Sequence, residues 1–466
     1  MKINSVIKSI LYFVVTAIIL CIPALYNRYV LFYTDSALYL EQAIKLTALV
    51  DRPIGYGYFI RVTTWQSTMW LAIFFQGIIA SLLIYHTLKT TLLNIKFKKI
   101  YHFYSICILT VFSSLSWYVS LLMPDIFTSF LVLAVFNILF GKNNTFTYIL
   151  YSVLIFFLIL SHMSNIPVLI LIMATIWISI WVKKSFRDLR KKALLGTAII
   201  MIMCSVTIGY LIKYNYDHYH KACLSPTSGI FFMARLIDTG VVDVYLKENC
   251  DKKKYRICEY KDKLPNWSQM FIWDLNGCFY KMGGWSNYQE EPKLIIKDIL
   301  SSPKYYAWLA GDFTLATLKQ LCHIRTGDGI NNFTSEQGLA VYNSCMRDFP
   351  RNEFKREFVN SKQSTNDLTF ETLNIFHTLT VLFSLVLIVY VASRHKLNDK
   401  ISLMMITGLS GIFFNAAVCS NLSGILDRYQ ARVIWLIPFI AIVLFLNYLL
   451  PSIKAFFQNI LYRQEI

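Results

Sequence analysis

The sequence lacks several patterns that would place it in a common protein class. It has no internal repeat and no low-complexity segment, so it indicates neither a repeat protein nor a compositionally biased chain. Its ten cysteines show no Cys-x-x-Cys or Cys/His spacing, which argues against a zinc site. The net charge is +18, but no recognition motif or basic-aromatic pattern accompanies it, so nucleic acid is not the expected partner.

Charged residues are also scarce, at 15% of the chain, whereas 56% of the residues are hydrophobic. A chain of 466 residues with this composition is too apolar for a soluble protein. The basic residues cluster in short segments between apolar runs, where they set membrane topology and contact anionic lipid. The expected class is therefore an integral membrane protein, with membrane lipids among its partners.

The apolar runs predict how often the chain crosses the membrane, because a hydrocarbon core about 30 Å thick needs about 20 apolar residues per helix. Ten runs are read, at roughly 7–27, 67–88, 101–121, 126–141, 146–161, 164–182, 193–213, 373–393, 401–420 and 432–450. The third and fourth are divided at "MPD" (123–125), because an Asp at mid-membrane costs at least about 2.5–3.5 kcal/mol. The first run lacks a small-residue cleavage site and is read as a retained helix. These runs predict an α-helical polytopic membrane protein with about ten transmembrane helices.

The basic segments predict the orientation of these helices. With Lys2 and Lys8 in the cytoplasm, ten alternating crossings also place the run "KKSFRDLRKK" (183–192) there. The same count puts the long segment 214–372 and the short segment 421–431 on the opposite side of the membrane.

Three parts of the chain follow from this topology. Residues 1–213 are expected to form an N-terminal membrane module of seven helices, with a catalytic first outer loop at 28–66. Residues 214–372 are less apolar and carry turn sequences such as "SPTSG", so we expect an extracytoplasmic domain of short, mixed elements between helices seven and eight. Residues 373–466 are expected to form a C-terminal membrane module of three helices.

The cysteines favour the same sidedness. Six of the ten lie in the segment 214–372, at Cys223, Cys250, Cys258, Cys278, Cys322 and Cys345. An even number in an extracytoplasmic domain predicts disulfides rather than zinc, with fifteen possible connectivities. Cys250 and Cys258 are near enough in sequence to close a small loop, and we expect at least two disulfides.

Five ionisable residues from separate places in the sequence are predicted to lie at the outer membrane boundary: Asp35, Asp125, His162, Arg428 and Arg432. Each has a structural interpretation, because the two Asp residues could cap helices, the His could be interfacial, and the Arg residues could anchor a helix at lipid headgroups. Ionisable residues at membrane depth are functional candidates by default. Their convergence on one face, beside a large domain, favours a functional site.

Acids and arginines together suit a particular chemistry. A carboxylate can deprotonate an acceptor hydroxyl or hold a metal ion. Arginine binds phosphate oxygens in a bidentate manner and stabilises a phosphate leaving group. A lipid-linked phospho-sugar presents its phosphate at this depth, so the site is expected between the membrane helices and the extracytoplasmic domain. If a divalent metal such as Mg²⁺ or Mn²⁺ takes part, Asp35, Asp125 and His162 are its candidate ligands.

Three motifs, in order, resemble multi-spanning C-type (GT-C) glycosyltransferases. An acidic residue after the first membrane helix, an amphipathic helix and then "RPIGYGYF" is similar to the entry pattern of the protein mannosyltransferase and aminoarabinose transferase branch. That pattern commonly ends Arg-Pro-Pro-Gly-Tyr-Pro, and here Ile54 and Gly57 replace two prolines. "MPDIFTSF" resembles the second acidic motif of the branch. "LSHMSNIPVL" resembles its segment of a basic residue or His before a Pro-containing helix. The matched motifs cover roughly residues 7–180.

The resemblance implies a hexosyl- or pentosyltransferase that uses a polyprenyl-phosphate sugar as donor and a glycan, lipid or protein as acceptor. It implies that Asp35 is the catalytic base or lies beside it, and that Asp125 holds the acceptor, a metal or the geometry of the base. Arg52 and Tyr56, within the first motif, and His162 are then candidate substrate-binding residues, with Arg428 and Arg432 on the phosphate. Some members use a divalent metal and others do not, so the cofactor stays open.

Bacterial serotype-converting glucosyltransferases, which decorate lipopolysaccharide O-antigen outside the inner membrane, have a comparable size and layout. From this likeness we expect a multi-pass protein that is located in a bacterial inner membrane. Two other functions stay open. An O-antigen polymerase or ligase with a lipid-diphosphate donor relies more on outer-loop residues such as His323 and Arg325 than on an early Asp. A lipid flippase or transporter should show broken helices or inverted repeats at mid-membrane, and none is found.

Overall fold

The computed structural model describes residues 2–92, 97–330 and 353–454, together with the single residues 332, 343, 345 and 347. All regular elements of these described residues are helices, which confirms the predicted α-helical class. Six helices are long and apolar enough to cross a membrane. They are Trp70–Thr91, Asn165–Val182, Lys184–Tyr219, Glu371–Arg394, Asp399–Leu422 and Asp427–Lys454. These helices support a membrane protein.

Four shorter apolar helices, Val6–Leu20, Lys99–Phe112, Pro124–Phe140 and Thr145–Ser161, occupy the remaining predicted runs. Helices therefore occupy every predicted apolar run, although Cys21 interrupts the first run and Ser113 and Ser114 interrupt the third, while ten membrane crossings stay a prediction. The helices of the first part are α1 (Lys2–Leu20), α2 (Ile22–Asn27), α3 (Ser36–Lys45), α4 (Gly55–Thr64), α5 (Trp70–Thr91), α6 (Lys99–Phe112), α7 (Leu115–Ser120), α8 (Phe127–Phe140), α9 (Thr145–Ser161), α10 (Asn165–Val182) and α11 (Arg190–Tyr219).

The chain breaks where proline was expected to break it. Helix α7 ends at Ser120, and a short 3₁₀ helix beginning at Pro124 leads into α8. The backbone of Met123 is extended, as expected for a residue that precedes proline. Asp125 therefore lies at a helix boundary rather than within a continuous helix.

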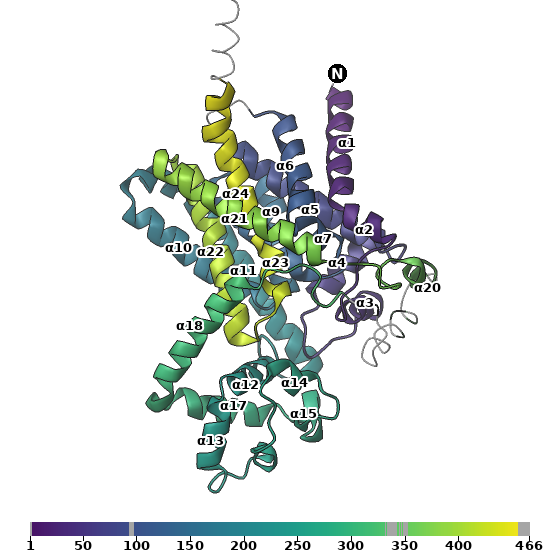
Figure 1. Ribbon diagram of the computed structural model, residues 1–466, viewed down its shortest axis with the longest axis vertical. Coiled ribbons are helices and arrows are strands. Elements are labelled where there is room, and N and C mark those ends of the chain that lie inside the picture. The colour runs from purple at the N-terminus through teal and green to yellow at the C-terminus, as the bar shows by residue number, and fades with distance from the viewer. Residues whose placement is uncertain are drawn as a thin grey trace, which may run out of the picture.

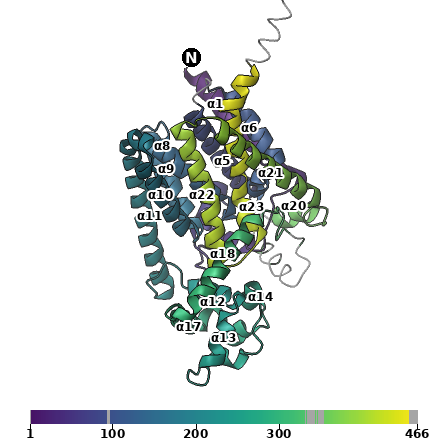
Figure 2. The same ribbon diagram turned by 60° about the vertical axis from the view of Figure 1, so that its left-hand side comes forward.

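The helices of the middle part form a separate lobe below the bundle in Figures 1 and 2. This lobe contains α12 (Ser228–Asp238), α13 (Val241–Asn249), α14 (Ser268–Trp273), α15 (Cys278–Lys281), α16 (Gly284–Asn287) and α17 (Glu290–Leu300). Helix α18 (Tyr306–Cys322) returns towards the bundle. The lobe has its own core, which includes Met233, Leu236, Phe271 and Phe279. The mixed elements expected for residues 214–372 are, in the described part, helices and loops, because the turn sequences separate short helices rather than strands.

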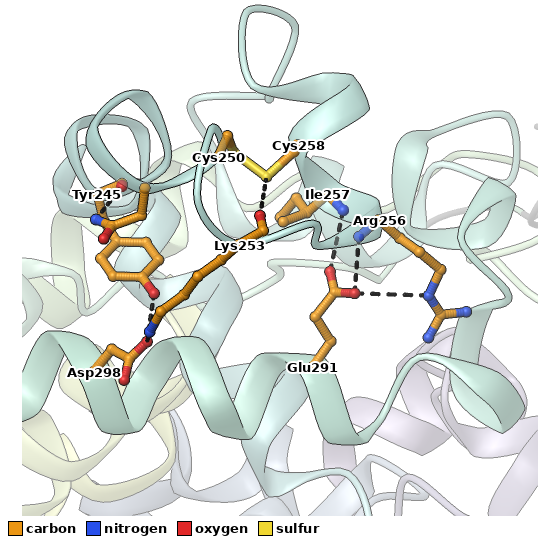
Figure 3. Close-up of a disulfide and its surroundings, with 9 residues drawn as sticks. Tyr245, Cys250, Lys253, Arg256, Ile257, Cys258, Glu291 and Asp298 are labelled. Carbon is orange, nitrogen blue, oxygen red and sulfur yellow. Dashed lines mark hydrogen bonds and ion pairs between the residues drawn. A yellow bond between two sulfur atoms is a disulfide. The ribbon is translucent and has the colours of Figure 1, made fainter.

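One disulfide closes a loop of the lobe, between Cys250 and Cys258 (Figure 3). Glu291 of α17 fastens this loop, because its carboxylate accepts hydrogen bonds from the backbone N–H groups of Arg256 (2.9 Å) and Ile257 (3.1 Å). Lys253, inside the loop, pairs with Asp298 on the same helix. The disulfide and these contacts hold the loop on α17.

The expectation of at least two disulfides is only partly met. Cys250–Cys258 is the one disulfide among the described residues, and Cys223, Cys278 and Cys322 remain thiols. Cys278 is buried in the core of the lobe, whereas Cys322 is exposed at the end of α18. The prediction used only the number of cysteines and their expected compartment. A disulfide also requires that the two Cα atoms lie about 4.4–6.8 Å apart, which the sequence does not show.

The last part of the chain returns to the bundle through α20 (Glu353–Glu357), α21 (Glu371–Arg394), α22 (Asp399–Leu422), α23 (Asp427–Ile434) and α24 (Leu436–Leu444). The start of α1 and the end of the last described helix lie at the end of the bundle opposite the lobe (Figures 1 and 2).

Contacts at the two ends of the bundle show which segments lie together. Lys183 pairs with Asp399 at 3.4 Å, which joins two loops that were both expected in the cytoplasm. At the other end, the backbone N–H of Leu31 in the first outer loop donates to Ser120 at 3.0 Å. The location of these ends relative to a membrane stays a prediction.

Candidate functional site

A cavity of about 760 Å³ lies between the membrane helices and the lobe. Its lobe wall comes from α12, α14 and α17 and includes Phe231, Phe232, Gln269, Trp273, Lys293 and Lys297. Its bundle wall comes from the first outer loop and from α10, α22 and α23, and includes Asp35, Arg52, His162, Cys419 and Arg428. Apolar side chains such as Ile166, Val418 and Leu422 complete the bundle wall.

Asp35 directly precedes α3 but does not cap it, because its side chain makes no hydrogen bond to the first turn. Its carboxylate instead contacts both terminal nitrogens of Arg52, at 3.1 Å from Nη1 and 3.3 Å from Nη2. A third contact, at 3.3 Å, comes from Nη1 of Arg428. The capping explanation of Asp35 therefore has no support, and two arginines share this carboxylate on the cavity wall.

Arg52 reaches the cavity from the loop between α3 and α4, where it also pairs with Asp51 at 3.1 Å. Its guanidinium lies 5.5 Å from the ring centre of Tyr39. The start of α4, directly after this loop, packs closely against the end of α9 because Gly55 has no side chain. A Cβ atom at Gly55 would lie 2.5 Å from the backbone of Leu160. Gly55, the first glycine of "DRPIGYGYF", thus allows α4 to pack against α9 and so positions Arg52.

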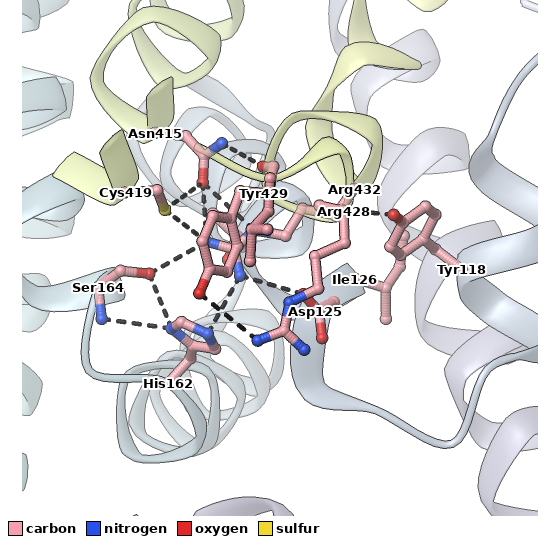
Figure 4. A network of polar contacts seen from close by, with 12 residues as sticks. Tyr118, Asp125, Ile126, His162, Ser164, Asn415, Cys419, Arg428, Tyr429 and Arg432 are labelled. Atoms are coloured by element: carbon pink, nitrogen blue, oxygen red, sulfur yellow. Dashed lines mark hydrogen bonds and ion pairs between the residues drawn. The ribbon is translucent and has the colours of Figure 1, made fainter. Parts of the chain in front are cut away.

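Asp125 belongs to a second network, in which Arg432 of α23 is the common donor (Figure 4). Arg432 is fully buried and its Nη1 donates to Asp125 at 3.3 Å and to Nε2 of His162 at 3.1 Å. Its Nη2 donates to Ser164 at 3.1 Å and to Asn415 at 2.9 Å. A residue with no exposed surface cannot anchor a helix at lipid headgroups. Arg432 instead joins four segments of the chain into one rigid unit.

Asp125 and Tyr56 also lie behind the cavity wall rather than in it. The side chain of Asp125 is 4% exposed and caps neither adjoining helix. Tyr56 is fully buried, donates to Gln76 at 2.9 Å and packs against Tyr39. The structure thus brings Asp35, Arg52, His162 and Arg428 to the cavity, and places Asp125, Arg432 and Tyr56 as supporting residues around it.

Sequence reasoning missed several residues of the cavity wall. Asp51 directly precedes Arg52 in the sequence but was not predicted to belong to the site. Lys293 and Lys297 are four residues apart on α17, and this spacing places them on the same helix face. Phe231 and Trp273 gave no signal in the sequence, because aromatic side chains of short helices belong more often to a core.

Electrostatics at the wall favour an ionised Asp35 and a neutral His162. Burial raises the pKa of Asp35, but Arg52 and Arg428 outweigh burial and hold it at about 2. Burial, together with Arg432 and Arg428, lowers the pKa of His162 well below its usual value. The three carboxylates of Asp35, Asp51 and Asp125 face the three guanidiniums of Arg52, Arg428 and Arg432, so their formal charges cancel.

The candidate metal ligands do not form a metal centre. Among the described residues, no group of three or more His, Cys, Asp or Glu side chains is arranged to hold a metal ion. Both predicted acids already face arginine, and a guanidinium competes with a cation for the same oxygens. This set of donors does not fit Mg²⁺ or Mn²⁺, so no step is assigned to a metal. Comparison with protein-family models, curated proteins and solved structures finds no match to this chain.

Proposed function

We propose that this protein is a glycosyltransferase that moves a sugar from a polyprenyl-phosphate donor to a glycan, lipid or protein acceptor on the extracytoplasmic side of the membrane. One observation carries the proposal: Asp35, Arg52 and Arg428 meet on the wall of a cavity that is lined by residues of both the bundle and the lobe. The GT-C-like order of motifs in residues 7–180 gives independent support.

The proposed reaction assigns a role to each side chain on the bundle wall. Asp35 accepts the proton of the acceptor hydroxyl, whose oxygen then bonds to the anomeric carbon of the sugar. The bond between that carbon and the phosphate oxygen breaks, and polyprenyl monophosphate leaves with the electron pair. Arg428, with Arg52, stabilises the negative charge of the leaving phosphate. The apolar side chains Val418 and Leu422 accommodate the isoprene units nearest the phosphate.

The supporting residues fix this geometry. Arg432 ties Asp125 and His162 to α23, the same helix that carries Arg428. Any displacement of the Asp125 segment therefore acts on Arg428 through one short helix. Asp125 and Arg432 are positioning residues in this proposal, and neither contacts a substrate.

The lobe wall suits the acceptor. Phe231 and Trp273 offer aromatic surface, and Gln269 offers an amide beside it. Lys297 adds a positive charge on the same wall. Apolar and aromatic surface with few convergent polar groups is typical of small-ligand sites. An acceptor held on the lobe wall would present its hydroxyl towards Asp35.

The two alternative functions have less support. His323 and Arg325 do not line the cavity, and His323 instead lies 3.6 Å from Asp427. A polymerase or ligase centred on these residues would therefore need a second site. A transporter would require polar residues at mid-membrane, whereas the polar residues named here lie at the junction with the lobe.

A transfer assay tests the proposal directly. Purified protein is incubated with a panel of radiolabelled polyprenyl-phosphate sugars and a membrane-derived acceptor fraction, with and without a chelator. We expect label from at least one donor to reach the acceptor, and Asp35→Asn to abolish that transfer. Thermal melting is used to verify that the protein is folded. If the folded protein neither releases nor transfers sugar from any donor, the proposal is contradicted.

A further inference from the structure

Among the described residues, every arginine of the bundle wall already faces a carboxylate. Asp35 occupies Arg52 and Arg428, Asp51 adds a second acid to Arg52, and the pair of Asp125 and Arg432 is closed behind the wall. A polyprenyl-phosphate sugar is a phosphodiester with one negative charge. A phosphate that binds this neutral wall therefore competes with a carboxylate for its arginine.

Arg428 is the arginine best placed for such an exchange. It contacts Asp35 through Nη1 alone, whereas Arg52 holds the same carboxylate with both terminal nitrogens. Its Nη2 makes only a long contact of 3.5 Å with Tyr429, and its buried Nε has no hydrogen-bond partner among the described residues. By comparison, Arg432 uses all three of its nitrogens.

The guanidinium of Arg428 is nevertheless held in place. Its carbon lies 4.3 Å from the ring centre of Tyr33 and 5.0 Å from that of Tyr429. Its backbone N–H donates to Asp328 at 3.2 Å, and its carbonyl accepts from Tyr118 at 3.2 Å. A guanidinium that is fixed by packing but poorly used in hydrogen bonding is prepared for a ligand with several acceptor oxygens.

We propose that the donor phosphate binds Arg428 by displacing Asp35 from it, so that the base is released only after the donor has bound. This inference rests on the proposed function and deepens it. Besides Arg52 and Arg428, Tyr33, Tyr39 and His162 interact electrostatically with Asp35, and Asp51, Tyr429, Lys293 and Lys297 line the same cavity. Apart from Arg52 and Arg428, the described residues of the bundle wall carry no positive charge at neutral pH, and the two lysines belong to the opposite, lobe wall.

The exchange solves a chemical difficulty of the resting site. A carboxylate with a pKa of about 2 is a poor base for a hydroxyl at neutral pH. Once phosphate neutralises Arg428, the pKa of Asp35 rises, because only Arg52 still stabilises its charge. The acceptor proton then moves to Asp35, and the phosphodiester becomes a phosphomonoester with one more negative charge. Return of Arg428 to Asp35 afterwards expels both the proton and the product.

Equilibrium binding of a product-like probe tests the exchange without any turnover. The dissociation constant of farnesyl phosphate, a short polyprenyl monophosphate, is measured by calorimetry for wild type, Asp35→Asn and Asp35→Asn/Arg428→Gln. Competition predicts that Asp35→Asn binds the probe at least about tenfold more tightly, the lower end of what one neighbouring charge does to an equilibrium. The double variant should lose this gain, because the guanidinium freed by the first change is absent.

Two control substitutions distinguish the exchange from a general change in the charge of the protein. Asp262→Asn removes an exposed acid of the lobe and should leave the dissociation constant unchanged. Lys263→Gln, which removes an exposed positive charge of the lobe, should also leave the gain in Asp35→Asn intact, since the gain belongs to the bundle wall. If wild type binds farnesyl phosphate and Asp35→Asn binds it equally or more weakly, the exchange is refuted while the proposed function stands. If neither folded protein binds the probe, the proposed phosphate site itself is wrong.

Discussion

Arg428 and Arg432 lie four residues apart on α23, yet they have opposite relationships to the cavity. Arg428 lines the wall with an incomplete set of hydrogen bonds, whereas Arg432 is fully buried and its nitrogens are all engaged. The first arginine is therefore available to a ligand, and the second holds the bundle together. Single substitutions can separate these roles.

Replacement of Asp35 tests the base. Asp35→Asn should reduce transfer at least about a hundredfold, because an amide cannot accept the acceptor proton. Stability at neutral pH should fall, because the ion pairs of Asp35 with Arg52 and Arg428 are lost, so the activity is compared only in preparations that remain folded. Transfer rates and thermal melting of the same preparation measure both effects. Near-normal turnover by this variant would show that Asp35 is not the base.

Replacement of Arg432 tests the buried network. Arg432→Ala should destabilise the protein by about 3–5 kcal/mol, because it leaves Asp125 buried without a cationic partner. Arg428→Gln is the matched comparison on the same helix and should weaken donor binding with a much smaller effect on stability. Melting temperatures in detergent, together with binding of farnesyl phosphate, distinguish the two variants. Equal melting temperatures for both would contradict the division of roles.

The acid sensitivity of the site follows from the pKa of Asp35. Its value of about 2 in the folded protein lies below the ordinary 3.8, so the unfolded chain binds the proton more readily. The ion pair therefore stabilises the fold above about pH 4, and this contribution is lost as the pH falls towards 2. Melting of wild type and Asp35→Asn between pH 6 and pH 2, as approximate limits, measures the difference. A difference between them that persists unchanged at the acid end would be inconsistent with this origin.

The disulfide of the lobe should act locally. Cys250→Ser/Cys258→Ser opens a loop whose ends are eight residues apart, which in the chain-entropy model removes up to about 3 kcal/mol. Because Glu291 still binds the backbone of Arg256 and Ile257, we expect loop opening rather than loss of the lobe. Limited trypsin digestion should cut the variant faster within residues 251–257. Unchanged digestion would mean that the contacts to Glu291 hold the loop without the disulfide.

The predicted sidedness is tested by labelling with an impermeant thiol reagent in intact cells or spheroplasts. A cysteine introduced into 183–192 should be protected until the membrane is opened. One introduced at an exposed lobe position such as Lys252 should react at once. Labelling of the 183–192 position from outside would overturn the ten-helix topology.

The sequence predicted the helical runs and the meeting of Asp35, Asp125, His162, Arg428 and Arg432, because membrane burial makes both apolar length and ionisable residues informative. It could not tell which of these residues face a cavity. Arg428 and Arg432 look alike in "DRYQARVIW", and only the packing of α23 against α22 and the 3₁₀ turn at Asp125 separates them. The partner of each charge was equally hidden, since Arg432 and Asp125 are 307 residues apart.

That long separation also bears on how the protein is made. Asp125 emerges early in synthesis, but the guanidinium that neutralises it belongs to the last apolar segment of the chain. Until α23 is in place, every nascent intermediate carries an acid next to membrane helices without its cation, and His162 and Asn415 lack their common donor as well. A product truncated before residue 427 therefore lacks more than its last helices, because Asp125 stays buried in the bundle without its cationic partner.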